Sequence, residues 1–264
     1  MAEPFKETPR VVSRTRRAES LETRDFSFTE SQVQFDWADE TLRTYRRRAW
    51  QAYQAKPVPT TAEEAWRRTD IRGLKADTFQ IPEQDRHLDL PAAPEWLLVP
   101  LADGSHGGEL VLMAGGVHRS LDAGLTQKGV VFTDYQSALR DHPALVAKIL
   151  GKAVRPEDGK FAALTASLAQ TGVFLYVPRN VQLETPLHSL LWGPGSGLAY
   201  ISHLLIYLEE GAAVTYVHEA ASPTEKGGQT LHSGIVEIYV GPQANLRFVV
   251  SVAKQYQGQG LSLP

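Results

Sequence analysis

Histidines are the residues of this chain whose type and spacing could do chemistry. Four of its eight histidines fall within residues 188–232, at His188, His203, His218 and His232. Neutral imidazole is the commonest transition-metal ligand that proteins use, and histidine is also the usual acid or base near neutral pH. Whether the chain is an enzyme therefore depends first on whether its fold brings these side chains together.

A cupin-like, metal-dependent enzyme is one interpretation, with His203, His218 or His232 as metal ligands. Such sites use two histidines one residue apart and a carboxylate shortly after them, and no His-x-His occurs in this sequence. His218 and Glu219 are adjacent, but neighbouring side chains in a strand point to opposite faces. We therefore expect structural roles for the histidines and keep the cupin-like enzyme as the alternative.

Other catalytic or cofactor signals are missing from the sequence. It contains no cysteine, which excludes thiolate catalysis and cysteine-ligated metal or iron–sulfur centres in this chain. The glycine-rich stretch at 193–197 lacks the lysine of a phosphate-binding loop and is predicted to be a tight turn. We expect no enzyme activity and assign no catalytic, cofactor-binding or metal-binding residue.

Composition is that of an ordinary globular protein. The 264 residues are 42% hydrophobic and carry a formal net charge of −3, so no general attraction to nucleic acid is expected. No apolar run approaches the roughly 18 residues of a membrane span, and the N-terminus has no secretory signal. These features predict a cytoplasmic protein, with a partly disordered leader over residues 1–36.

Residues 37–172 are predicted to form a helical N-terminal region with one short β-hairpin. The hairpin signal lies at 109–121, around Gly115 and Gly116. Helices are expected over residues 37–56, 60–70, 134–150 (broken at Pro143) and 160–172 (closed by Gly172), with a proline-rich connector over 80–100. In the first helix, the arginine cluster Arg43, Arg46, Arg47 and Arg48 is expected on a solvated face.

Residues 173–264 repeat one pattern three times. Tyr176, Tyr207 and Tyr239 stand 31 and 32 residues apart, each between two aliphatic residues. A near-constant period of this length is typical of stacked architectures. It predicts a right-handed parallel β-helix (β-solenoid) core, or a related jelly roll. The two predicted ladders are Leu175, Ile206 and Ile238, and Leu183, Val214 and Leu246.

Three stretches resemble the SufB/SufD family of scaffold proteins in Suf iron–sulfur cluster assembly. They are PTTAEEAWRRTDIRGL (59–74), KFAALTASLAQTGVFLYVPRNVQLETPLH (160–188) and IYLEEGAAVTYVHE (206–219). The lack of cysteine and the helix expected around Trp66 look more like the SufD branch. Trp66 itself is expected to pack as a helix anchor and not to bind a ligand.

The resemblance implies a helical N-terminal region, a central right-handed parallel β-helix and a C-terminal helical domain. It also implies a non-catalytic scaffold that pairs with a SufB-like paralogue and works with a SufC-like ATPase. The iron–sulfur cluster is then assembled by the complex and not held stably by this chain. An unrelated β-solenoid binding module is a further alternative.

This sequence departs from the family pattern after LRFVV (246–250), where further coils and the helical domain would follow. A C-terminally truncated β-helix is therefore expected, and no functional residue of the family is transferred to it. The incomplete core predicts an exposed last strand that self-associates, and weak binding of the ATPase.

Overall fold

The structure, a computed structural model, describes residues 25–37, 39–82, 90–102, 106–114, 116–223 and 227–255. Most of the leader predicted over residues 1–36 thus lies outside the described residues. From residue 25 onward the segment is packed against the rest of the protein, because Phe26 and Phe28 are both buried in the main core.

Six α-helices and nine β-strands form within these residues. The helices are α1 (Glu40–Ala55), α2 (Glu95–Ala102), α3 (Ala123–Gln127), α4 (Tyr135–Asp141), α5 (Pro143–Ile149) and α6 (Lys160–Leu168). The strands are β1 (Gly108–Met113), β2 (Gly116–Leu121), β3 (Val131–Asp134), β4 (Thr171–Val177), β5 (Leu187–Trp192), β6 (Ala199–Leu208), β7 (Ala213–Pro223), β8 (Leu231–Val240) and β9 (Asn245–Gln255).

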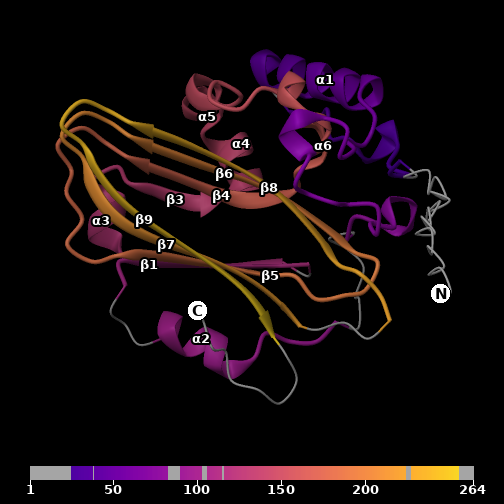
Figure 1. Cartoon of the computed structure of the whole chain (residues 1–264). Helices are drawn as coiled ribbons and strands as arrows, with labels where there is room; N and C mark the ends of the chain where they lie inside the picture. Colours follow the sequence, from indigo (N-terminus) through magenta and orange to yellow (C-terminus); the bar gives the residue numbers. More distant parts are fainter. Residues whose placement is uncertain are drawn as a thin grey trace, which may run out of the picture.

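The strands build two sheets that lie face to face (Figure 1). One has the order β2-β1-β5-β7-β9 and the other β3-β4-β6-β8. From β4 to β9, successive strands alternate between the sheets, and each pairs in parallel with the strand two places along the chain. The pairs β1–β2 and β3–β4 are antiparallel, so both sheets are mixed.

The predicted right-handed parallel β-helix is therefore wrong as the fold class. The described strands form two open mixed sheets and no solenoid, and six α-helices make the fold α/β and not mainly β. The repeat misled because it reports only the parallel strands from β4 onward. It carries no signal for β1, β2 and β3, which precede it and add the antiparallel pairs.

The strand register that the repeat predicts is confirmed. Leu175 lies opposite Ile206, and Ile206 lies opposite Ile238; Val214 lies opposite Leu246 in the other sheet. Leu175 and Ile206 are fully buried between the sheets. The expected burial of Ile238 is wrong, since 38% of this residue is exposed. It lies in β8, the last strand of its sheet, where the inner face is no longer covered.

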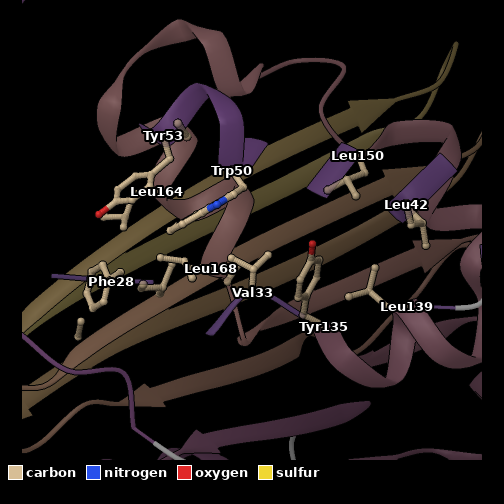
Figure 2. Close-up of a cluster of buried hydrophobic side chains, with 14 of the residues drawn as sticks. Phe28, Val33, Leu42, Trp50, Tyr53, Tyr135, Leu139, Leu150, Leu164 and Leu168 are labelled. Carbon is tan, nitrogen blue, oxygen red and sulfur yellow. The ribbon is translucent and has the colours of Figure 1, made fainter. Parts of the chain in front are cut away.

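A helical layer covers the outer face of the four-stranded sheet (Figure 1). Helix α1 begins at Asp39, whose carboxylate accepts hydrogen bonds from the amides of Thr41 and Leu42. The helix predicted over 37–56 is thus confirmed, as is the break at Pro143, which starts α5. Side chains of α1, α4, α5 and α6 meet in one core above the sheet, where Figure 2 shows Trp50, Tyr135 and Leu164 among others.

The outer face of the five-stranded sheet is covered more thinly. Helix α2 lies over it and packs Leu97 against a small cluster that includes Val111 and Trp192. The sequence predicted a connector over residues 80–100, so the start of α2 is an element that sequence analysis missed. The prolines before it indicated a connector, but a helix begins at Glu95.

Two local predictions need correction. Residues 60–70 hold only a three-residue 3₁₀ turn, Glu64–Trp66, in place of a helix. Trp66 nevertheless packs, with its ring centroid 5.3 Å from that of Phe161. Helix α6 ends at Leu168 and Gly172 lies in β4, where a Cβ atom would stand 2.0 Å from the carbonyl oxygen of His203. That glycine thus permits close strand packing and does not cap a helix.

Candidate functional site

The four late histidines do not form one centre. Each is hydrogen-bonded to a residue on the next parallel strand: His188 to Glu219, His203 to Glu237, His218 to Ser189 and His232 to Ser202. Among the residues that the structure describes, no group of three or more histidine, aspartate or glutamate side chains is arranged to hold a metal ion. The cupin-like alternative, with its clustered ligands, is therefore not favoured.

Two of these histidines do approach each other from opposite sheets. His218 on β7 and His232 on β8 both lie on inner faces, and each accepts or donates one hydrogen bond of 2.8 Å with a serine hydroxyl. Burial, helped by nearby His232, lowers the pKa of His218 to about 4, and burial also lowers the pKa of His232. Both rings are thus neutral near pH 7 and serve as polar packing.

His203 and Glu237 form a fully buried pair beneath the helical layer. Their Nε2 and Oε2 atoms are 3.0 Å apart. The Glu237 carboxylate also accepts hydrogen bonds from the amides of Gly151, Ala153 and Val154, in the loop after α5. The pair therefore fastens that loop to the outer face of the sheet.

The electrostatics of this pair favour a charged glutamate and a neutral histidine. Burial alone would raise the pKa of Glu237, but the hydrogen bond and charge of His203 and the amides of Gly151 and Ala153 lower it overall. Burial lowers the pKa of His203, against the opposing pull of Glu237. The Tyr239 hydroxyl is a fifth donor, and a buried carboxylate with five donors needs no cofactor or substrate to explain it.

His188 and Glu219 form a similar pair on the outer face of the other sheet. His188 Nε2 lies 3.2 Å from Glu219 Oε2. On its other side, His188 Nδ1 lies 3.4 Å from Nε2 of His106, which precedes β1. The Glu219 side chain is 28% exposed, whereas that of Glu237 is fully buried.

The arginine cluster of α1 divides into two kinds. Arg43 and Arg48 are on the surface, paired with Glu40 and Glu157, as the predicted solvated face requires. Arg46 is wrongly assigned to that face, because it is buried and donates hydrogen bonds of 3.1 Å to carbonyls of α6 and the residue after it. Its guanidinium also lies 4.2 Å from the ring centroid of Trp37.

A group of exposed apolar side chains lies at one end of the two sheets, which we call the open end. It consists of the inner-face side chains Val236, Ile238, Val240 and Val250, all more than a third exposed. Among the described strands, β8 and β9 each pair on one side only. Unpaired strand edges beside apolar side chains are typical of protein-binding surfaces.

Sequence reasoning missed the acidic partners, above all Glu237. The strand register could have predicted the contact between His203 and Glu237. Glu237 stands two residues after Ile235, the residue that pairs with His203. Making this prediction requires the strand alignment first, and then the rule that alternate residues share a face. His106 carried no such signal, since it lies outside the repeat.

Over the described part of the chain, no helix has both the length and the apolar character needed to cross a membrane. The model of the SufBD protein N-terminal region matches residues 25–188. The model of the SUF system FeS cluster assembly SufBD core domain matches residues 192–258.

Curated relatives carry the same family description. Iron-sulfur cluster assembly SufBD family proteins of Staphylococcus epidermidis and Staphylococcus haemolyticus are each 36% identical over 132 residues, and one of Staphylococcus aureus is 35% identical. Each alignment covers 50% of this chain and 28% of the relative, so the matched part is less than a third of those proteins. On the family models, the chain belongs to the SufBD family of iron–sulfur cluster assembly proteins.

Proposed function

We propose that the chain is a SufD-like scaffold subunit of a Suf iron–sulfur cluster assembly complex and is not catalytic on its own. The observation that carries this proposal is the match of both family models, in order, along residues 25–188 and 192–258. Assignment to the SufD branch rests on the resemblance of its N-terminal motifs and on the lack of cysteine.

The buried polar side chains make structural hydrogen bonds, which supports a non-catalytic role. The buried carboxylate of Glu237 is taken up by one imidazole and three amides, and Arg46 by two carbonyls and a tryptophan ring. These contacts fasten helices and loops to the sheet. Since the chain has no thiolate to offer, we propose that the cluster is cargo of the complex and is ligated mainly by partner residues.

We propose that the open end is the surface through which this scaffold works, in the cytoplasm, with a SufB-like paralogue and through it a SufC-like ATPase. Strand edges offer backbone donors and acceptors to a partner strand, and the exposed valines offer apolar area. The proposed partner is therefore another β-sheet protein that extends both sheets at once.

A second copy of this chain meets the same requirement. We propose that the 264-residue chain self-associates through β8 and β9 when no paralogue is present. Light scattering at tens of micromolar should then give a dimer or larger species. A strictly monomeric chain, with residues 246–252 protected in hydrogen exchange, would contradict self-association.

Co-purification tests the proposed function itself. The chain would be co-expressed with a SufB-like protein and a SufC-like ATPase and captured through a tag on the paralogue. We expect all three proteins to elute together in size-exclusion chromatography. Elution of the chain apart from both partners would overturn the scaffold assignment, and turnover of a small-molecule substrate by the purified chain alone would overturn its non-catalytic part.

A further inference from the structure

His106, His188 and Glu219 form a row on the outer face of the five-stranded sheet, and the proposed scaffold role does not explain it. His188 Nδ1 faces His106 Nε2 at 3.4 Å, and His188 Nε2 faces Glu219 Oε2 at 3.2 Å. We infer that His106 and His188 form a two-histidine binding site for a divalent transition metal, with Glu219 as a positioning residue. This inference does not rest on the proposed function.

The sheet register holds these groups in place. His188 pairs with Val217, so Glu219, two residues farther along β7, lies diagonally across on the same face. His106 is fixed from the other side, because the amide of Gly107 donates a hydrogen bond of 2.9 Å to the carbonyl of Pro186, just before β5. His188 is therefore held by β5, and His106 by the segment that leads into β1.

Glu219 determines which nitrogen of His188 is available. A carboxylate accepts a proton-bearing donor, so His188 carries its proton on Nε2 and presents the Nδ1 lone pair to His106. Metal-ligating histidines usually donate their second ring N–H to a carboxylate in this way, which fixes the tautomer and strengthens the ligand. His203 has a similar carboxylate on Nε2, but its ring is fully buried under the helical layer.

The distance between the facing nitrogens is long for a hydrogen bond and is also the distance expected between two ligands of one metal ion. Donor–acceptor distances in hydrogen bonds from N–H groups are typically about 2.7–3.2 Å. Two imidazole nitrogens about 2.0–2.1 Å from one tetrahedral ion stand roughly 3.3–3.4 Å apart. The observed 3.4 Å matches the second arrangement.

The chemistry of the ligands selects the class of metal. Imidazole nitrogens suit zinc, copper, nickel and iron, whereas magnesium and calcium require oxygen ligands. Because the described residues contain no third metal-binding side chain arranged with this pair, water or a partner protein must complete the coordination. The partly exposed Glu219 carboxylate lies close enough to offset part of the ion's charge.

Zinc titration of the untagged chain, followed by calorimetry, tests the inference. We expect one Zn²⁺ per chain, bound with an affinity that falls at least tenfold in H106Q and in H188Q. E219A should weaken binding by about 10–100-fold, the usual effect of removing a carboxylate behind a ligating histidine. H142Q is the matched control, since His142 is a partly exposed histidine between α4 and α5, over the other sheet.

Histidine nitrogen chemical shifts give a second readout that does not depend on affinity. Zinc should shift the resonances of His188 Nδ1 and His106 Nε2 and leave His142 unchanged. The inference is overturned if no zinc binds, or if zinc binds equally well to H106Q and to the unmodified chain. Circular dichroism of each variant checks that the fold is retained, and E219A, which alters no ligand, keeps the test valid if H188Q unfolds.

Discussion

The two sheets carry the same histidine–glutamate pair on their outer faces, in different surroundings. In each, the glutamate stands two residues after the residue that pairs with the histidine, which gives His203–Glu237 on β6 and β8 and His188–Glu219 on β5 and β7. The nitrogen–oxygen distances are 3.0 Å and 3.2 Å. The strand register therefore makes the pair, and the layer above it determines what the pair does.

The two histidine–glutamate pairs differ in how deeply they are buried. The first pair lies under four helices and is fully buried, with three loop amides on its carboxylate. The second keeps 28% of its glutamate side chain exposed, and the other ring nitrogen of its histidine contacts His106. A covered pair holds the fold together, whereas an open one remains available to a ligand.

Removal of the covered carboxylate should have the largest effect. Glu237→Ala leaves the buried His203 ring and the amides of Gly151, Ala153 and Val154 without their acceptor, and each hydrogen bond to a charged group typically contributes about 1.5–3 kcal/mol. Urea unfolding would measure this loss of stability.

Glu219→Ala is the matched control for that experiment. Because Glu219 is partly exposed and makes one hydrogen bond to His188, its removal should cost less than about 1 kcal/mol. Equal losses in the two variants would refute the distinction between covered and open pairs.

The inner ladder offers a second contrast between covered and open positions. Ile206→Ala removes a fully buried side chain between the sheets and should cost roughly 2–5 kcal/mol. Ile238→Ala, at the next position of the same ladder, should cost under about 1 kcal/mol, since Ile238 is at the open end. Thermal or urea unfolding of both variants checks this, and a larger loss for Ile238→Ala would mean that the open end is covered in solution.

Acid should weaken the fold through its covered histidines. The pKa of His218 falls from an ordinary value of 6.5 to about 4 in the folded chain, so between these values the unfolded chain binds a proton that the folded chain does not. Stability should therefore be full above pH 6.5 and fall by about 1.4 kcal/mol per pH unit below it for this group. His203, whose pKa is also lowered, adds to the same loss.

Urea unfolding at pH 7, 6 and 5 would measure this slope, and His218→Gln should make it shallower by about the contribution of one group. Glu237 acts in a lower range, because its lowered pKa means that its contribution is lost only below pH 4.5. A slope that His218→Gln leaves unchanged would assign the acid sensitivity to other residues.

The sequence predicts the repeated parallel strands of this fold, but not the strands and the helix that lie outside the repeat. Equal spacing of Tyr176, Tyr207 and Tyr239 was enough to align the strands, because parallel pairing places equivalent residues opposite each other. The antiparallel strands β1 to β3 and the start of α2 lack any such spacing. The β-helix prediction failed for that reason.

The candidate sites show the same limit. In the described part of the chain, the four late histidines lie on four different strands, and each is hydrogen-bonded to a different side chain. Spacing alone could not place Arg46 in the core, because its burial depends on the carbonyls at the end of α6, some 120 residues away. Nor could it bring His106 to His188, which requires the pairing of β1 with β5.

The most direct test of the central claim, that this SufBD-family chain works by binding partners through its open end, is a capture experiment with two matched variants. Val250→Asp places a charge at the open end, and Val117→Asp places one on a similarly exposed valine of β2, at the opposite edge of the same sheet. We expect a tagged SufB-like paralogue to retain the unmodified chain and Val117→Asp equally, and Val250→Asp at least tenfold less. Equal capture of Val250→Asp, or no capture of the unmodified chain, would contradict the claim.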